Sequence, residues 1–426
     1  MFTFLRTFSD STFSSLKIRN YRLYFIGQSI SVSGTWMQTI GQAWLVLKLT
    51  NSGTALGLVT ALQFLPVLFL GAMGGVIADR LSKRKILFFT QSASGILALI
   101  LGILVATNTI QLWMIYILAT SLGLINAIDN PTRRTFIIEM VGHKELRNAI
   151  TLFSTVFNLS RVIGPAIAGG IIAGFGLAPC FLINAASYIA VLICLFLMHK
   201  EELFSVEPVK RAKGQLREGL KYVYNTPLLR NVLFMMAIIG TFTYEFQVNL
   251  PLFAKFTFYG DASYFAFLNS AMGIGAVVGG LATASRKNST PRGLIKTALG
   301  FGVAVILASL APTFHLALVA MFIVGIFSIT FTSQGDTILQ LESAPAMRSR
   351  VVALWSVAFL GSTPIGGPII GLIGEYVGPR WSLATSGFAA IAAGIFGVIM
   401  LWNYVSPKIK EQIPEPAIII ESNKAI

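Results

Sequence analysis

The sequence predicts an all-α polytopic membrane protein, with twelve transmembrane helices in two six-helix lobes. The chain of 426 residues is 55% hydrophobic and only 12% charged, whereas a soluble domain carries about 25% charged residues. It divides into twelve apolar stretches separated by short polar breaks. The landmarks of the first six stretches recur in the last six, which indicates a duplicated bundle.

Each apolar stretch is about 18 to 27 residues long, which suits a hydrocarbon layer of about 30 Å crossed with some tilt. We predict helices over the following spans: Leu23–Leu47, Ala55–Ala78, Ile86–Ala106, Leu112–Asn130, Ala149–Gly174, Pro179–Met198, Asn231–Phe253, Ala262–Ala284, Leu294–Ala311, Leu316–Ile338, Val351–Val377 and Trp381–Tyr404.

The basic residues predict the orientation of these helices. With the N-terminus inside, nearly all Lys and Arg residues fall in cytoplasmic segments, and only Lys48, Lys255 and Arg380 fall outside. This asymmetry places both termini in the cytoplasm. It also accounts for the formal charge of +15, so we expect no nucleic-acid partner. No cleavable signal peptide is expected, because the stretch before Arg22 has no apolar core.

The longest polar break divides the chain into its predicted domains. We expect an N-terminal lobe over 1–198, a cytoplasmic linker over 199–230, a C-terminal lobe over 231–405 and a cytoplasmic tail over 406–426. Residues 216–223 of the linker have the apolar spacing of a helix that lies on a membrane surface.

The repeat is clearest in the fifth and eleventh spans. Gly164, Gly169 and Gly176 align with glycines 202 positions later, and Asp129 aligns with Asp336. Gly164, Pro165 and Gly169 form a helix-packing motif, because small residues allow close helix contact and proline bends a helix.

Two charged residues lie inside predicted spans. Arg161 is costly in lipid, so it either meets an anionic substrate group or forms a structural contact with a carboxylate or a helix end. Glu245 is the deepest carboxyl, with Gln247, Asn249 and Pro251 close by in sequence. It either carries protons as its access to water alternates, contacts a cationic compound, or is a structural, protonated or salt-bridged residue.

Aromatic and polar side chains near these charges are candidates for a substrate cavity. The predicted set is completed by residues of the first, seventh and eleventh spans: Trp36, Gln38, Phe242, Tyr244, Gln247, Asn249 and Trp355. Lipid contact or ordinary packing is the alternative for each aromatic residue.

Other chemistries find little support in the sequence. The three histidines lie outside the middle of any span and the two cysteines are fourteen positions apart in one span, so we expect neither a metal site nor a disulfide. No phosphate-binding run of the form G-x-x-x-x-G-K-S/T occurs, so ATP coupling is not expected. We expect no cofactor, and an enzyme is only a remote alternative.

The run from Gly75 to Lys85 resembles the loop between helices 2 and 3 of the major facilitator superfamily. That resemblance implies a cytoplasmic gate formed by Gly75, Asp79, Arg80 and Arg84. The glycine motif of the fifth span is similar to that of superfamily antiporters. Further runs resemble the branch that includes the enterobactin exporter and macrolide efflux proteins: 19–22, 27–28, 36–38, 43–47, 129–134, 146–149 and 347–351.

The resemblance implies proton-coupled export of drug-like compounds or siderophores by alternating access. We predict Glu245 and Asp129 as the proton-coupling residues. Uptake, or flipping of lipids such as lysophospholipids, is the alternative on the same fold. The expected partners are a small-molecule substrate, protons and the lipid bilayer. We expect a monomeric multi-pass protein of the bacterial cytoplasmic (inner) membrane.

Overall fold

The first five long helices form one bundle in the computed structural model, which describes residues 13–204, 215–284, 289–345, 347–402 and 404. The predicted tail over 406–426 and part of the predicted linker lie outside the described residues. A short 3-10 turn, η1 (Ser14–Lys17), precedes the helices of this bundle: α2 (Arg19–Thr50), α3 (Gly53–Arg80), α4 (Lys83–Ala106), α5 (Leu112–Phe175) and α6 (Ala178–Phe196).

Helix α5 contains two of the predicted spans. Its 64 residues run without a loop through a kink at Gly142, where φ is 66° and ψ is −175°. Positive φ is readily adopted only by glycine, so Gly142 lets the fourth span turn directly into the fifth. The predicted polar loop between these spans is therefore helical.

The second bundle follows a connection that holds η2 (Lys200–Glu202) and α7 (Gln215–Asn225). Glu218 of α7 forms an ion pair of 2.8 Å with Arg350 of α13 (Arg348–Leu360). The bundle consists of α8 (Pro227–Phe242), α9 (Phe246–Leu252), η3 (Phe253–Thr257), α10 (Ala262–Ala284), α11 (Pro291–Ser309), α12 (Phe314–Glu342), α13 (Arg348–Leu360), α14 (Thr363–Tyr376) and α15 (Pro379–Leu401).

Two predicted spans are broken rather than continuous. The seventh divides into α8 and α9, and the backbone N–H groups of Thr243 and Tyr244 both donate to Ile239 at the break. Pro251 follows in α9 and cannot donate a backbone hydrogen bond. The eleventh span divides into α13 and α14, where Pro364 occupies the first turn of α14. Each of these two spans therefore consists of two helices.

Ten helices among the described residues are long and apolar enough to cross a membrane. One of them is α5, which holds two spans, and α2 is not among the ten. Helix α2 has 32 residues, or about 48 Å at about 1.5 Å per residue, but buried glutamines such as Gln28, Gln38 and Gln42 lower its hydropathy. Counting both halves of α5 and α2 gives the twelve predicted spans.

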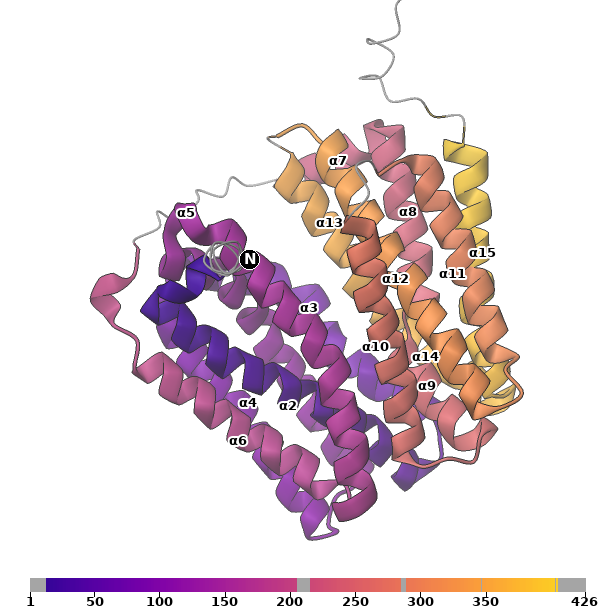
Figure 1. Cartoon of the computed structure of the whole chain (residues 1–426), viewed down its shortest axis with the longest axis horizontal. Helices are drawn as coiled ribbons and strands as arrows, with labels where there is room; N and C mark the ends of the chain where they lie inside the picture. Colours follow the sequence, from indigo (N-terminus) through magenta and orange to yellow (C-terminus); the bar gives the residue numbers. More distant parts are fainter. Residues whose placement is uncertain (1–12, 205–214, 285–288, 346, 403, 405–426) are drawn as a thin grey trace, which may run out of the picture.

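Backbone meets backbone where α3 of the first bundle crosses α14 of the second. A Cβ atom built on Gly57 would lie 2.3 Å from the Gly367 carbonyl oxygen, and one on Gly53 would lie 2.4 Å from that of Gly371. Side chains at these positions would push the helices apart. The bundles converge toward this end of the molecule, near α9, and diverge toward the end that holds α7 (Figure 1).

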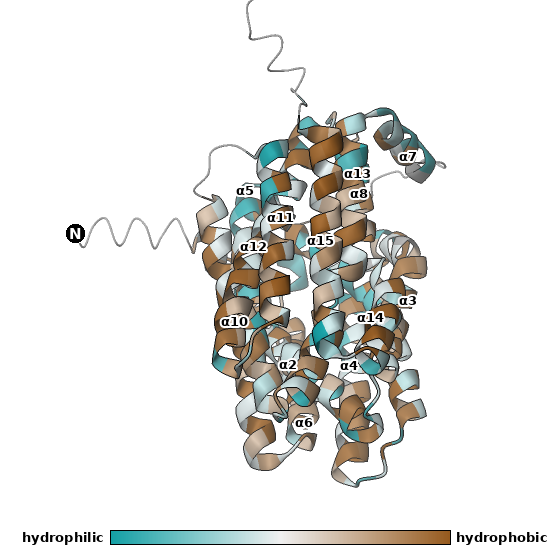
Figure 2. Cartoon of the chain, turned by 90° about the vertical axis from the view of Figure 1, so that its right-hand side faces the viewer, coloured by the Kyte–Doolittle hydropathy of each residue, from teal (hydrophilic) through white to brown (hydrophobic). Residues whose placement is uncertain are grey.

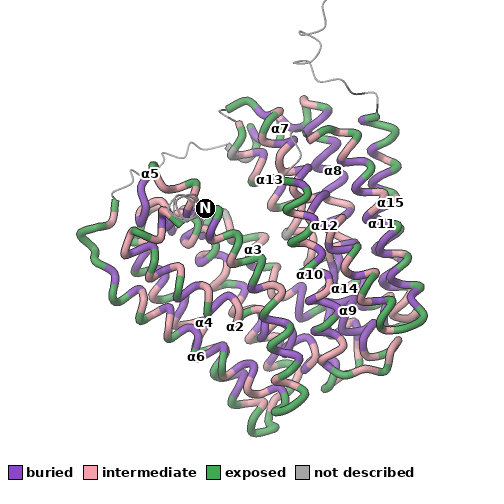
Figure 3. The backbone as a smooth tube through the Cα atoms, viewed as in Figure 1, coloured by how far each residue is buried: buried purple, intermediate pink, exposed green. Residues whose placement is uncertain are grey.

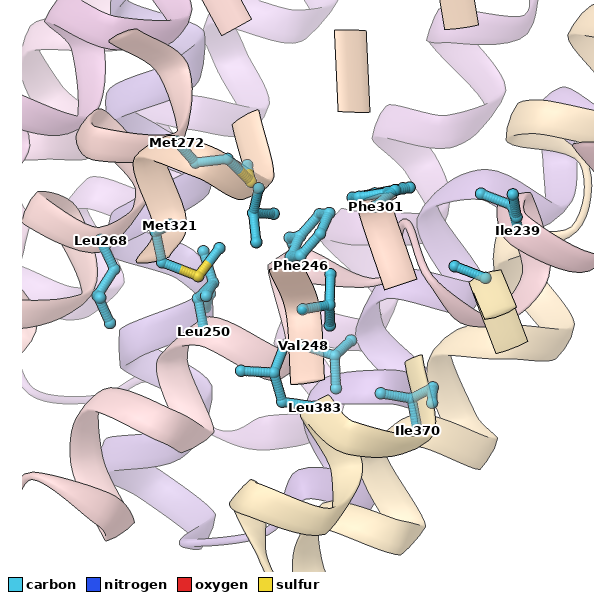
Figure 4. Close-up of a cluster of buried hydrophobic side chains, with 14 of the residues drawn as sticks. Ile239, Phe246, Val248, Leu250, Leu268, Met272, Phe301, Met321, Ile370 and Leu383 are labelled. Atoms are coloured by element: carbon cyan, nitrogen blue, oxygen red, sulfur yellow. The ribbon is translucent and has the colours of Figure 1, made fainter. Parts of the chain in front are cut away.

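Apolar side chains serve both the core and the outer surface. Figure 4 shows buried residues of α9 and of the helices around it, including Phe246, Phe301 and Leu383. Large apolar residues such as Phe89 and Ile399 are more than 70% exposed. Figure 2 shows brown, hydrophobic stretches along the outer helices, and Figure 3 shows green, exposed positions along them. Such an apolar exterior is suited to lipid.

Candidate functional site

Arg161 and Trp36 meet where α5 crosses α2. The guanidinium carbon of Arg161 lies 5.6 Å from the centroid of the Trp36 ring, which is a cation–π distance. Gly164 allows the two helices to approach closely, because a Cβ atom built on it would lie only 2.6 Å from the Cβ atom of Trp36. The Phe157 ring lies 6.1 Å from the Trp36 ring, so the arginine packs beside a pair of aromatic side chains.

Tyr244 faces this arginine from the second bundle. It lies in the break between α8 and α9, near enough to Arg161 for the two side chains to interact electrostatically. Its hydroxyl donates to the Ser328 carbonyl oxygen at 2.7 Å. The rings of Phe359 and Phe246 are 4.9 and 6.2 Å from its own. Arg161, Trp36 and Tyr244 therefore form one cluster with members from both bundles.

Glu245 follows Tyr244 and is only 2% exposed. Its Oε1 atom has no hydrogen-bond partner, and Thr363 lies beside the carboxyl group. Cβ atoms on Gly366 and Gly367 would lie 3.0 and 3.5 Å from its two carboxyl oxygens. The glycines of α14 thus leave space for the carboxyl group. Since Gly367 also approaches the Gly57 carbonyl oxygen of α3, Glu245 lies beside the contact between bundles.

Asp129 lies wholly inside the first bundle and is 1% exposed. One carboxyl oxygen accepts hydrogen bonds from Thr90 at 2.6 Å and Gln91 at 2.8 Å. The other oxygen forms an ion pair with Arg133, whose guanidinium also donates to Gln28 at 2.6 Å. This carboxylate is fully occupied by its own bundle.

Two predicted cavity residues bond inside their own bundles instead. The Gln38 side-chain oxygen accepts from Asn184 of α6 at 2.6 Å. Asn249 is fully buried and donates to the Ser386 hydroxyl of α15 at 2.9 Å. The structure does not bring these two amides to the Arg161 cluster.

The remaining predicted cavity residues are Trp355, Phe242 and Gln247. Trp355 is 7% exposed, and its ring would lie 2.4 Å from a Cβ atom on Gly335 of α12. It therefore packs inside the second bundle. Phe242 at the end of α8 and Gln247 in α9 are half-buried, on either side of the helix break.

The predicted gate residues lie along the turn from α3 to α4: Gly75, Asp79, Arg80 and Arg84. Arg84 is 9% exposed and donates to the carbonyl oxygens of Leu195 at 2.8 Å and Phe196 at 3.0 Å. It caps the C-terminus of α6, where a positive charge is favourable. Asp79 is half-buried in the last turn of α3, and Arg80 is exposed.

The glycine motif of α5 contacts both bundles. Gly164 faces α2, whereas a Cβ atom on Gly169 would lie 2.9 Å from that of Ala266 in α10. Pro165 between them is buried within the helix. The motif therefore packs α5 against its own bundle and against the opposite one.

Lys255 contacts the first bundle from the second and was not predicted as a site residue. Its ammonium group donates to the Leu47 carbonyl oxygen and to the Asn51 side-chain oxygen, both at 2.7 Å. These acceptors lie at the C-terminus of α2, the negative end of the helix dipole. The lysine thus caps a helix across the junction between the bundles.

Glu375 of α14 was also not predicted, and it binds the neighbouring end of α3. It accepts from the Ser52 hydroxyl at 2.6 Å and the Thr54 backbone N–H at 2.9 Å. A helix N-terminus favours a negative charge, so Lys255 and Glu375 match the two helix ends that flank one turn. We call these two residues with Asn51 and Ser52 the interbundle clasp. The sequence signal for the clasp is that Lys255 is one of the few basic residues that fall outside the predicted cytoplasmic segments.

Comparison with known proteins identifies the family. Residues 10–421 match the model of a family described as transmembrane secretion effectors. The chain belongs to this family. It is thus a transporter of the major facilitator superfamily and not an enzyme, which confirms the resemblance seen in the sequence.

Two curated relatives are named as transporters. The chain is 26% identical over 412 residues to the staphyloferrin A transporter of Staphylococcus aureus, covering 92% of this chain and 98% of the relative. It is 25% identical over 386 residues to the enterobactin exporter EntS of Shigella flexneri, covering 89% and 91%.

Solved structures show the same fold. A bacterial homolog of the human lysosomal transporter Spinster, inward-facing and occupied, superposes with a TM-score of 0.72 at 15% identity, over 91% of this chain and 98% of that one. The nucleoside transporter NupG gives a TM-score of 0.71 at 16% identity, over 92% and 100%. The predicted major facilitator fold is confirmed.

Proposed function

We propose that this transporter is a proton-coupled exporter of a small organic compound, of the drug-like or siderophore kind. The observation that carries the proposal is Glu245, a buried carboxyl group with an unpartnered oxygen at the contact between bundles. A proton carrier needs a carboxyl group whose surroundings change during transport. Relatives named as a siderophore transporter and a siderophore exporter support the substrate class.

Alternating access is the proposed mechanism. The bundles move about the site between them, and the present arrangement is the state closed at the end of the interbundle clasp. The hydrogen bonds of Lys255 and Glu375 and the glycine contact of α3 with α14 join the bundles there. All three must separate when that end opens.

Glu245 is proposed to bind and release the coupled proton as these contacts separate. The neighbouring Gly366 and Gly367 belong to α14 and approach α8 and α3 respectively, so movement of the bundles changes the surroundings of the carboxyl group. Asp129 remains a second proposed proton-coupling residue, through its ion pair with Arg133.

We place the protein in the cytoplasmic membrane of a bacterium as a monomer, with both termini and α7 in the cytoplasm. The charge asymmetry of the connecting segments supports this orientation. The clasp then lies on the outer side. The proposed lobe limits remain 1–198 and 231–405, joined by the linker over 199–230.

Reconstituted protein tests the proposal. A thermal-shift screen of antibiotics, dyes, siderophores and lysolipids first selects a transported compound, which is then followed in liposomes with an imposed pH gradient. We expect gradient-driven transport by the wild type and by Glu202→Gln, an exposed control, but not by Glu245→Gln. Wild-type accumulation by Glu245→Gln would contradict proton coupling, and the direction of accumulation decides between export and uptake.

A further inference from the structure

Arg161 is a charged residue within a membrane span, and the groups around it compensate its positive charge only in part. It lies in the second half of α5, between the close contacts of that helix with α2 and α10. Its Nε atom is buried and has no hydrogen-bond acceptor. An ionised side chain at this depth is costly unless an opposite charge or hydrogen-bond acceptors face it.

The neighbours of Arg161 supply little of this compensation. The Trp36 ring contributes a cation–π contact at 5.6 Å, which is weaker than an ion pair with a carboxylate at the same depth. The Tyr244 hydroxyl is already hydrogen-bonded to Ser328. Among the described residues, Arg161 forms no ion pair with a carboxylate.

The buried carboxyl groups of the two bundles are placed elsewhere. Asp129 is occupied by Arg133, Thr90 and Gln91. Glu245 faces the glycines of α14. Neither is therefore available to neutralise Arg161 in this arrangement.

We infer that Arg161 and Trp36 form an anion subsite, which binds a planar oxyanion such as a carboxylate attached to an aromatic or flat apolar group. The guanidinium donates to the oxyanion, a pairing whose geometry is planar and bidentate. The flat group stacks against the Trp36 ring, and Tyr244 encloses it from the opposite bundle. This inference rests on the proposed transport function and names the charge class of its substrate.

Binding to the full chain in lipid nanodiscs, without any gradient, tests the subsite. The probes are 1-naphthoate, its neutral amide 1-naphthamide, and the cation 1-naphthylmethylammonium, measured by titration calorimetry. We expect the wild type to bind naphthoate at least about tenfold more tightly than the amide, because hydrogen bonds to charged groups are the strong ones. Equal affinity for naphthoate and naphthamide would overturn the inference.

Three variants assign the preference to Arg161. Arg161→Lys keeps the charge and is expected to retain a reduced preference for naphthoate, whereas Arg161→Gln is expected to lose it. Lys48→Gln removes a charge from an exposed position of α2 and is expected to leave the preference unchanged. A full naphthoate preference in Arg161→Gln would also overturn the inference.

Thermal unfolding separates a binding role from a structural one. Removing an uncompensated charge is expected to leave the unfolding temperature of Arg161→Gln equal to or above that of the wild type. A structural ion-pair partner would instead lower it, because its carboxylate would be left unpaired. No gradient is used in the binding test, so its result does not depend on proton coupling. Conversely, if Arg161 and Trp36 bind no anion, gradient-driven transport of neutral compounds is still expected.

Discussion

Asp129 and Glu245 are equally buried carboxyl residues in contrasting surroundings. Asp129 is 1% exposed and has three donors, all from its own bundle. Glu245 is 2% exposed, has one oxygen without a donor, and lies beside the contact between bundles. A saturated ion pair stabilises one fixed arrangement, whereas an unsaturated carboxyl group can respond when its surroundings change.

The sequence predicts proton coupling for both residues alike. The contrast in their surroundings separates a proton-carrying role from a structural one. Burial is nearly the same for each. The difference lies in the surroundings. Asp129 is bonded by residues of α4 and α5, whereas Glu245 faces the glycines of α14. The comparison therefore assigns the larger transport effect to Glu245 and the larger stability effect to Asp129.

The largest expected effect on transport comes from Glu245→Gln. The amide keeps the shape of the side chain but cannot bind and release a proton, so gradient-driven accumulation should fall to background. Exchange of labelled for unlabelled compound at equal pH should persist, since it needs no net proton movement. Loss of exchange together with accumulation would instead indicate a structural role.

Asp129→Asn should reverse this pattern. The change leaves the Arg133 charge without its partner, and breaking such a buried pair typically costs about 3 to 5 kcal/mol. A clear drop in unfolding temperature in detergent is expected, with part of it recovered in the double variant Asp129→Asn/Arg133→Gln. A stable Asp129→Asn protein without proton coupling would show that Asp129 carries the proton. It would contradict the structural role given to Asp129 in the comparison with Glu245.

Weakening the interbundle clasp should change the balance of conformations by a moderate amount. A charge at a helix end is worth about 0.3 to 1 kcal/mol, so Lys255→Met or Glu375→Gln should raise the open-to-closed ratio about two- to fivefold. Spin labels at Leu58 and Tyr376, in a Cys180→Ser/Cys194→Ser background, report the distance between α3 and α14.

Lys48→Met is the control for this measurement, because Lys48 is an exposed lysine of the same helix end. Unchanged distance distributions in both clasp variants would show that the glycine contact alone holds this end closed.

Asp79→Asn should have the smallest effect. Asp79 lies in the last turn of α3, where the helix dipole disfavours a negative charge. If its interactions exchange when the bundles move, their loss should slow turnover while substrate affinity stays the same. Initial rates in liposomes across substrate concentrations separate these quantities, and an unchanged maximal rate would remove Asp79 from the gate.

The fold was predictable because span length, hydropathy and charge asymmetry are properties of the chain itself. The repeat from Gly164 to Gly366 indicated two bundles, and Arg161 and Glu245 were recognisable because ionised groups are rare in apolar spans. The two helix breaks were missed because hydropathy does not report a lost backbone hydrogen bond. The site role of the clasp was missed because its partners are more than two hundred positions apart.

The polar and aromatic cavity residues were less predictable. Gln38 and Asn249 are polar residues in apolar spans, yet each bonds to a neighbouring helix of its own bundle. Sequence does not tell which face of a span points toward the other bundle when both faces carry polar groups. Trp355 likewise packs against Gly335 in its own bundle.

The glycine contact of α3 with α14 has a practical consequence. Two surfaces without interlocking side chains can part and rejoin without any repacking of rotamers. A bulky residue at Gly57 or Gly371 would act as a wedge at that seam. Such a wedged protein offers a route to trapping the opposite conformation for structure determination, with no ligand or binder needed to hold it.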